Sequence, residues 1–181
     1  QESRVRELED ATALAFEGNP GANPVFVALG HVARRFGVPK HYAVELIEGM
    51  AMDVRKERYW TFDELSLYCY RVAGTVGLMM SHIMGVSDPR ALGNAADLGT
   101  AMQLTNIARD VLDDAAMGRV YLPLGWLDEE GISEAQLGLP KNRAAVARVT
   151  QRLLGEADRY YQSGRRGLRF LPWRCALAVA V

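Results

Sequence analysis

A row of carboxylates and amides with helical spacing is the part of this 181-residue sequence that most directly indicates chemistry. Asn106, Asp110 and Asp114 recur every four residues, so on a helix they share one face. Gln103 lies one turn earlier, and Asp113 stands beside Asp114. Like charges four residues apart destabilise a helix by about 0.2–0.5 kcal/mol, and the helix dipole adds to this cost near a C-terminus. A hard cation such as Mg²⁺ removes the repulsion, because its ligands are carboxylate, water and phosphate oxygens.

The same row has a second interpretation, an acidic face exposed to water. Arg109 and Arg119 would then be local partners of the acids, with Asp113 four residues after Arg109. A DxxDD spacing by itself does not separate the two interpretations. The amides upstream and the segment 118–123, Gly-Arg-Val-Tyr-Leu-Pro, make the pattern more specific.

Helical periodicity dominates the elements that must position these residues, and no segment alternates like a strand, so the sequence predicts an all-α fold. Pro24 and Gly37 are typical first and last residues of one such helix. The predicted helices cover roughly residues 5–17, 24–36, 40–58, 62–84, 90–117 and 142–164, and a last one begins at Pro172. A short segment, residues 124–131, lies between the last two of these ranges.

The predicted helix 62–84 has an unusual composition. Thr61 and Glu64 form a capping box at its start. After Leu65 it is apolar on nearly every face, which is typical of a helix in the centre of a bundle. Val72 and Val76 lie there among small residues, a pattern that indicates tight helix packing, an apolar wall for a long substrate, or both.

Composition excludes several classes of protein. With 49% hydrophobic and 24% charged residues the chain can bury a core, and its formal net charge of −1 gives no basic excess for nucleic acid. Cys69 and Cys175 lack metal-ligand spacing and are expected to be free thiols in a reducing cytosol. The sequence predicts no signal peptide and no membrane span.

Two blocks resemble signatures of the squalene and phytoene synthase family. Residues 106–114, Asn-Ile-Ala-Arg-Asp-Val-Leu-Asp-Asp, with the segment 118–123 after them, are similar to the second Asp-rich signature of the family. Residues 68–80, Tyr-Cys-Tyr-Arg-Val-Ala-Gly-Thr-Val-Gly-Leu-Met-Met, are similar to its other signature. The resemblance covers essentially the whole chain and implies an isoprenoid-synthase helical bundle. Residues 77–80 and 122–126 favour the bacterial phytoene synthases within it.

The resemblance implies roles for the polar residues. Asp110 and Asp114 match carboxylates that hold Mg²⁺ or Mn²⁺, which bridges to a substrate diphosphate. Asn106 matches a position that contacts metal or phosphate. Arg109 and Arg119 match basic positions near the diphosphates, a role that suits the planar donor fork of arginine.

It also implies roles for residues around the reacting carbons. Tyr68 matches a tyrosine beside the carbocation, although a lone aromatic on a buried helix is more often core. Tyr121 resembles a flap tyrosine near the site, and Gln103 is expected either to contact phosphate or to orient Asn106. Val72 and Val76 match the apolar wall for the prenyl chains.

The implied activity is a Mg²⁺-dependent, head-to-head condensation of two geranylgeranyl diphosphates to phytoene through a cyclopropyl diphosphate, in carotenoid biosynthesis and without NADPH. A squalene, dehydrosqualene or hydroxysqualene synthase that uses farnesyl diphosphate stays open as an alternative. So does a non-catalytic relative that acts in protein assembly, although such a relative is expected to lose the carboxylates that are intact here. Prenyl diphosphates are the expected partners and nucleic acid is not. A cytoplasmic location is expected, with peripheral association at the inner face of the membrane left open, as is the oligomeric state.

No Asp-rich DxxxD helix precedes Tyr68. Residues 1–181 are therefore expected to be the central part of one isoprenoid-synthase domain, incomplete at both ends and inactive alone. The first Asp-rich motif of the family is expected before this segment and further helices after it. Asp53, an acid in an apolar segment, is expected either to pair with Arg55 or Arg58 or to approach the metal site from a facing helix.

Overall fold

The computed structural model describes residues 2–86 and 88–180, and these form helices and turns without a strand. The predicted all-α fold is confirmed. The α-helices are α1 (Glu2–Phe16), α2 (Pro24–Phe36), α3 (Lys40–Arg55), α4 (Phe62–Cys69), α5 (Thr75–Ile83), α6 (Arg90–Ala116), α7 (Leu124–Glu129), α8 (Arg143–Gly167) and α9 (Trp173–Ala180). A π-helical turn, η1 (Tyr70–Gly74), joins α4 to α5, and the 3₁₀ turns are η2 (Glu134–Gln136), η3 (Pro140–Asn142) and η4 (Leu168–Phe170).

Side-chain caps set several helix ends where the sequence predicts them. The side chain of Asn23 accepts a hydrogen bond from a backbone N–H in the first turn of α2, and Gly37 ends that helix in a left-handed conformation. Before α4, the N–H of Glu64 donates to Thr61 Oγ1 at 3.3 Å, and the N–H of Thr61 donates to the Glu64 carboxylate at 3.0 Å. The predicted capping box is therefore confirmed.

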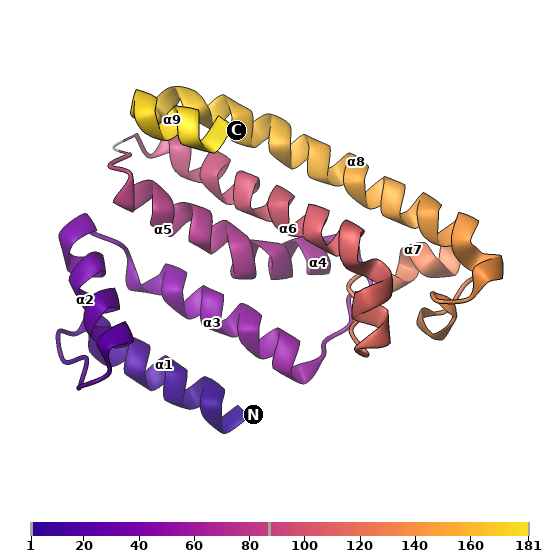
Figure 1. The fold of residues 1–181 in the computed structure, drawn as a ribbon, viewed down its shortest axis with the longest axis horizontal. Coiled ribbons are helices and arrows are strands. Elements are labelled where there is room, and N and C mark those ends of the chain that lie inside the picture. Colours follow the sequence, from indigo (N-terminus) through magenta and orange to yellow (C-terminus); the bar gives the residue numbers. More distant parts are fainter. Residues whose placement is uncertain (1, 87, 181) are drawn as a thin grey trace.

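The helices lie in layers (Figure 1). Helix α6 lies between α8 on one side and the continuous rod of α4, η1 and α5 on the other. Helix α3 packs on the far side of that rod, and α1 and α2 pack in turn on α3 and the end of α5. This order brings the acids of α6 and residues of α3 toward the rod from opposite sides.

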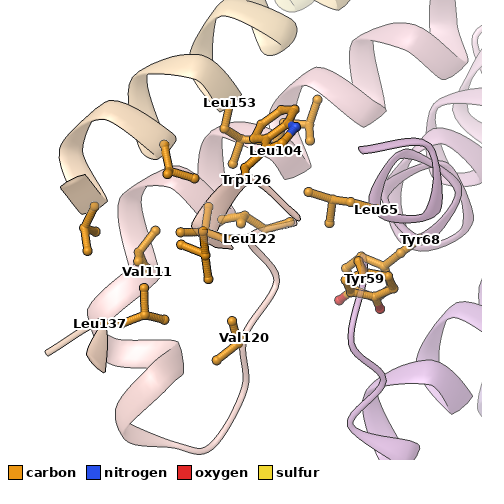
Figure 2. Packing of buried hydrophobic residues seen from close by; sticks show 14 of the residues in the cluster. Tyr59, Leu65, Tyr68, Leu104, Val111, Val120, Leu122, Trp126, Leu137 and Leu153 are labelled. Atoms are coloured by element: carbon orange, nitrogen blue, oxygen red, sulfur yellow. The ribbon is translucent and has the colours of Figure 1, made fainter. Parts of the chain in front are cut away.

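The main core fills the space between α4, α6, α7 and α8 (Figure 2). Large side chains with 0–1% of their surface exposed form its centre: Leu65, Leu104, Leu122, Leu127 and Leu153. Burying one leucine contributes about 1.5–3 kcal/mol, so this cluster fixes the segment after α6 against α4. Cys69 is buried beside the cluster and Cys175 is half-buried, and both are free thiols, as predicted.

Two predicted helix boundaries differ from the structure. The third helix ends at Arg55, because Lys56 adopts a left-handed conformation with φ of 52° and turns the chain away before Arg58. The segment 62–84 is one rod, but the π-helical turn at residues 70–74 interrupts its α-helical hydrogen bonding. Hydrophobic spacing cannot reveal such a turn, because it shifts the helical phase by less than one residue per turn.

Within the described residues the rod is not covered on every side. Leu67, Val76 and Met80 expose 47%, 40% and 44% of their surfaces. Leu67 lies on α4 before the π-helical turn, and Val76 and Met80 lie on α5 after it, and these exposed apolar positions make up the open face of the rod. Because the sequence predicts further helices before and after residues 1–181, a central position of the rod in the whole bundle stays a prediction.

Glycines let α6 approach the rod at backbone contact. A Cβ atom added to Gly99 of α6 would overlap the Ala73 carbonyl, and one added to Gly77 would overlap the Ala95 carbonyl. Both obstacles are backbone atoms, so no side-chain rotation relieves the overlap. This close approach holds the first half of α6 against η1 and α5.

Replacing Gly99 by alanine should therefore lower the free energy of unfolding by about 1–3 kcal/mol, as expected for overpacking. Gly93, on the same helix, has open space around its Cα, so Gly93→Ala should instead stabilise the protein by up to about 1 kcal/mol through helix propensity. Denaturant unfolding of both variants measures the difference. Equal effects would show that the contact between η1 and α6 at Gly99 is not close-packed.

Candidate active site

Helix α6 carries the predicted polar row in its C-terminal half. Asn106, Asp110 and Asp114 all lie within Arg90–Ala116, so their spacing places them on one helix face, as predicted. Asn106 is exposed, whereas Asp110, Asp114 and Gln103 are half-buried. The two carboxylates are therefore accessible to a ligand but less hydrated than acids on an open surface.

Arg109 pairs with its neighbour Asp110. Its Nη2 lies 2.6 Å from Asp110 Oδ2 and its Nε lies 2.7 Å from Oδ1, and these hydrogen bonds lower the pKa of Asp110. The sequence left Asp113 open as the alternative partner, and the structure places the guanidinium on Asp110 instead. The Arg109 side chain is 68% exposed, so little holds it there and it can turn toward an incoming phosphate.

Asp114 lies in a crowded negative environment. Burial raises the pKa of Asp114, and the charges of Asp110, Asp53 and Asp113 add to this rise, while Arg119 opposes it. Carboxylates from α3 and α6 therefore repel one another across this region. A bound cation would relieve that repulsion.

The donor set fits a magnesium ion held jointly with a substrate. Within residues 2–86 and 88–180, no three histidine, cysteine or acidic side chains are close enough to form a metal cage by themselves. The predicted ligands Asn106, Asp110 and Asp114 nevertheless offer only oxygen, the element that Mg²⁺ prefers, from one helix face. Mg²⁺ is commonly held by one or two carboxylates plus substrate phosphate, so these residues suit it without a complete protein cage.

Two tyrosines converge on one carboxylate opposite this row. The hydroxyl of Tyr68 donates to Asp53 with both oxygens at 3.0 Å, and the hydroxyl of Tyr121 donates to Asp53 Oδ1 at 2.7 Å. The expected pairing of Asp53 with Arg55 or Arg58 is wrong, because those arginines bind glutamates instead. Asp53, Tyr68 and Tyr121 come from α3, α4 and the segment before α7, so tertiary packing alone brings them together.

The two phenol rings are stacked and a third covers them. The centroids of Tyr68 and Tyr121 are 5.2 Å apart at an angle of 22°, and Tyr59 lies 5.5 Å from Tyr68 and 6.4 Å from Tyr121. Figure 2 shows Tyr59 and Tyr68 together, with their hydroxyl oxygens directed the same way. The backbone N–H of Leu124 donates to the Tyr59 carbonyl at 2.8 Å, which ties the segment after Tyr121 to the segment before α4. Sequence reasoning missed Tyr59, since it lies outside both signatures.

Burial keeps these phenols protonated. It raises the pKa of Tyr121 to about 12, and the hydrogen bond with Asp53 contributes. Burial and the Asp53 charge also raise the pKa of Tyr68. Both hydroxyls therefore remain hydrogen-bond donors to Asp53 at neutral pH.

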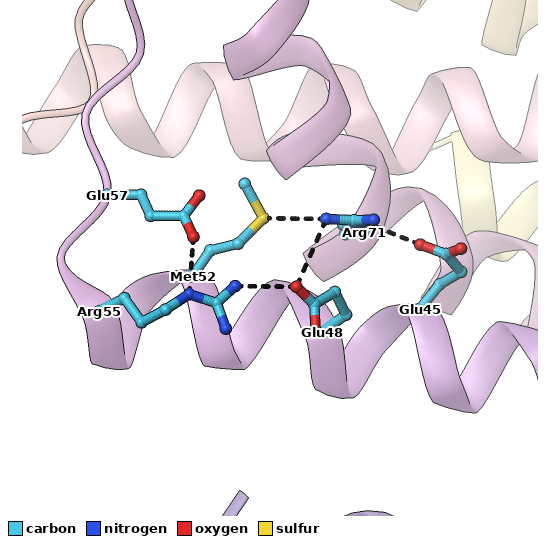
Figure 3. A network of polar contacts seen from close by, with 6 residues as sticks. All are labelled: Glu45, Glu48, Met52, Arg55, Glu57 and Arg71. Atoms are coloured by element: carbon cyan, nitrogen blue, oxygen red, sulfur yellow. Dashed lines mark hydrogen bonds and ion pairs between the residues drawn. The ribbon is translucent and has the colours of Figure 1, made fainter. Parts of the chain in front are cut away.

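An ion-pair network anchors η1, directly after Tyr68, to α3 (Figure 3). Arg71 Nε donates to Glu45 at 2.9 Å, and its Nη1 lies 3.8 Å from Glu48. Arg55 bridges Glu48 and Glu57 at 2.8 and 2.7 Å. The network joins η1, which follows α4 and its Tyr68, to α3, which carries Asp53.

The remaining predicted residues lie around this centre. Val72 packs on α3, where a Cβ atom on Gly49 would come within 2.7 Å of Val72 Cγ1. Val76 lies farther along the rod on its open face, and Arg119 is exposed just after α6. A pocket of about 330 Å³ lies elsewhere, between α6, α8 and residues 137–140, and none of the predicted site residues lines it.

Comparison with known proteins decides the family. The squalene/phytoene synthase profile matches residues 1–181. The chain belongs to the squalene/phytoene synthase family. It is 49% identical over 177 residues to a phytoene synthase of Pseudescherichia vulneris, covering 98% of this chain and 57% of that protein. It is 48% identical over 179 residues to a 15-cis-phytoene synthase of Pantoea ananas, covering 99% and 58%.

Solved structures of the family have the same fold. The crystal structure of squalene synthase HpnC from Alicyclobacillus acidocaldarius aligns with a TM-score of 0.91 at 27% identity, covering 99% of this chain and 68% of that one. A dehydrosqualene synthase in complex with ligand aligns with a TM-score of 0.86 at 29% identity, covering 98% and 64%. The predicted isoprenoid-synthase bundle is therefore confirmed. The chain spans just over half the length of the two phytoene synthases.

The two signature blocks lie close together in the folded chain. Block 68–80 contributes Tyr68, and block 106–114 with the segment after it contributes Asp114 and Tyr121. Asp53 belongs to neither block. Among the helices described, none is both long and apolar enough to cross a bilayer.

Proposed function

We propose that this protein is a phytoene synthase-type prenyltransferase. It condenses two geranylgeranyl diphosphates head to head into phytoene, through a cyclopropyl diphosphate, as a step of carotenoid biosynthesis. The observation that supports this most is the placement of the carboxylate row of α6 beside the Tyr68–Asp53–Tyr121 cluster. Similarity to proteins named phytoene synthase, at 48–49% identity, supports the choice of substrate and product.

The residues of the polar row bind the diphosphate and stabilise the charge that develops on it. Asp110, Asp114 and Asn106 would hold Mg²⁺ or Mn²⁺, which when bound neutralises the diphosphate as the allylic C–O bond breaks. Arg109 and Arg119, both exposed near this row, bind diphosphate oxygens, and Gln103 orients Asn106 or contacts phosphate. Catalysis then depends mostly on holding the leaving group and enclosing the cation.

The tyrosines and valines shape the space for the carbon chains. Tyr68 lies beside the reacting carbons with Tyr121 stacked on it, and electron-rich ring faces stabilise a nearby cation. Val72 and Val76 continue the same rod as an apolar wall. The product is a long hydrocarbon that water does not dissolve, so we propose that a cytoplasmic enzyme delivers it by peripheral contact with the membrane.

Bulk added at the wall should change the preferred chain length. Val76 exposes 40% of its surface on the open face of the rod, so Val76→Phe should lower use of geranylgeranyl relative to farnesyl diphosphate by about tenfold. Val25→Phe, at a 67% exposed position on α2, is the matched control and should leave the ratio unchanged. Competition between the two substrates measures the ratio of their use. A Val76→Phe protein of normal stability and unchanged preference would place Val76 outside the wall.

The alternative within the family is synthesis of squalene, dehydrosqualene or hydroxysqualene from farnesyl diphosphate. The similar solved structures carry names of this kind, but at 27–29% identity they are more distant than the phytoene synthases. A non-catalytic assembly role is disfavoured because the carboxylates of α6 are intact.

Product analysis separates these functions. The protein, expressed from its complete reading frame, should convert geranylgeranyl diphosphate to phytoene in the presence of Mg²⁺ and without NADPH. Parallel reactions with farnesyl diphosphate, with and without NADPH, are compared by chromatography and mass spectrometry. Faster formation of a squalene-type product would favour the alternative, and no product from either substrate would favour a non-catalytic role.

A further inference from the structure

Asp53 is an unusual acid because two phenols share it. It lies near the C-terminus of α3, half-buried, and receives the Tyr121 hydroxyl at 2.7 Å and the Tyr68 hydroxyl at 3.0 Å. The arginines next to it in sequence are occupied, since Arg55 bridges Glu48 and Glu57 and Arg58 binds Glu134. Within the described part of the chain, the hydrogen bonds that reach this carboxylate come from tyrosines.

The arrangement determines where the phenol lone pairs point. A phenolic hydroxyl has one hydrogen and two acceptor lone pairs. When the hydrogen is given to Asp53, the lone pairs of Tyr68 and Tyr121 face away from the carboxylate. A hydrogen bond to an ionised acceptor is about twice as strong as a neutral one, and it draws negative charge onto the phenol oxygen. Two stacked rings fixed in this way form one electron-rich surface.

Other acids of the region have different surroundings. Asp110 is held by Arg109, and Glu45 and Glu48 are held by Arg71 and Arg55. Glu45 and Glu48, which join α3 to η1, take Arg71 as a cationic partner, whereas Asp53 takes two hydroxyl donors. Among the described residues, Asp53 receives tyrosine hydroxyls and forms no ion pair, so a cation near the phenols would have to come from a ligand.

We propose that Asp53 is a positioning residue for the cationic steps of the reaction. It binds the hydroxyl hydrogens of Tyr68 and Tyr121, so that both phenol oxygens face the allylic cation. Its role is distinct from that of the acids on α6, which face the diphosphate. This inference rests on the proposed function, which supplies the identity of the cation. The hydrogen-bonded cluster of Asp53, Tyr68 and Tyr121 does not depend on that function.

The kinetic test uses Asp53→Asn, which keeps the shape but removes the charge. Loss of hydrogen bonds to a charged group predicts a fall in kcat of about 10- to 100-fold. The KM for the diphosphate should stay within about twofold, because the α6 acids are untouched. The Mg²⁺ concentration at half-maximal rate should change by less than about tenfold, because Asp53 acts on Asp114 only through its charge. Glu129→Gln removes the same charge from an acid that binds Arg152, outside the network of Figure 3, and should keep wild-type kcat. A Mg²⁺ requirement raised in Asp53→Asn as far as in Asp110→Asn would instead make Asp53 a metal ligand and overturn the proposal.

A double-mutant cycle separates positioning from a structural role. If Asp53 acts through the phenols, Asp53→Asn should lower kcat by at most about twofold when it is added to the Tyr68→Phe, Tyr121→Phe double variant. The same loss in both backgrounds would contradict the proposal.

A measurement without substrate keeps the cluster and the proposed function apart. In protein labelled with ¹³C at tyrosine Cζ, Asp53→Asn should move the resonances of Tyr68 and Tyr121 but not that of Tyr160, which bonds Ser66. Unmoved resonances would overturn the hydrogen-bonded cluster. Moved resonances in a protein that forms no prenyl product would leave the cluster standing and overturn the proposed function instead.

Discussion

Asp110→Asn or Asp114→Asn should each lower the rate of prenyl condensation by several orders of magnitude while leaving the fold intact. Each change removes a carboxylate from the oxygen donors that suit Mg²⁺, and so weakens the neutralisation of the leaving diphosphate. Asp114 should respond at least as strongly, because its half-buried carboxylate lies where Asp110, Asp53 and Asp113 crowd it with negative charge. Stability should not fall, since removing a like charge from a helix face relieves repulsion.

The assay compares turnover with varied Mg²⁺ and after chelation, in protein expressed from its complete reading frame. Asp113→Asn is the matched control, because Asp113 is an exposed acid on the same helix outside the predicted ligand set. It should change turnover by less than about tenfold. Near-normal turnover by Asp110→Asn or Asp114→Asn with the metal chelated would contradict the metal assignment. Circular dichroism and thermal unfolding verify that each variant is folded.

The sequence was sufficient for features that depend on local chemistry. The row from Asn106 to Asp114 follows from helical spacing alone, and α6 bears it out. The capping box of Thr61 and Glu64 spans three residues, so the sequence predicts it directly. In both cases the interacting groups lie within one or two helical turns, where chain geometry fixes their distance.

The features that the sequence did not predict depend on contacts between segments that are far apart in the chain. Asp53 meets Tyr68 and Tyr121 across 15 and 68 residues of sequence. Its sequence neighbours suggest an arginine partner, but Arg55 binds Glu48 and Glu57 because Lys56 turns the chain back at the end of α3. Of the two alternatives that local reasoning gave for Asp53, the arginine pairing is wrong, whereas an approach from the facing helix agrees with the effect of its charge on Asp114.

The π-helical turn shows a second limit. Residues 70–74 follow Tyr68 directly, and the Thr75 N–H donates to the Tyr70 carbonyl five residues back. Helix propensity and hydrophobic spacing are compatible with an uninterrupted α-helix there. The wider turn is stabilised by its neighbours, since Arg71 binds Glu45 of α3 and Gly74 packs against α6. π-helical turns often occur at functional sites, and this one begins two residues after Tyr68.

Tyr68→Phe should lower turnover by about 10²- to 10⁴-fold, the range expected when a positioned polar group is lost from the reacting centre. The hydroxyl of Tyr68 is fixed on Asp53, and its ring stacks on Tyr121 and packs at a tilt against Tyr59, so the variant keeps the packing and loses only the oxygen. Tyr121→Phe should lower turnover by a smaller factor, because the phenylalanine ring continues to cover Tyr68. Tyr160→Phe is the control, since it removes a hydroxyl that bonds Ser66 on α4 and not Asp53, and it should retain most of the activity.

The pH dependence makes this prediction sharper. Burial raises the pKa of Tyr68 and brings that of Tyr121 to about 12, above the ordinary value of about 10. Both hydroxyls are thus protonated throughout the range from about pH 7 to 9, and the ratio of wild-type to Tyr68→Phe turnover should be constant across it. A phenol that had to ionise in order to act would instead give a ratio that rises about tenfold per pH unit. Rates at saturating substrate and Mg²⁺ across this range distinguish the two, and a rising ratio would show that Tyr68 acts as phenolate and not as the neutral donor that its bond to Asp53 implies.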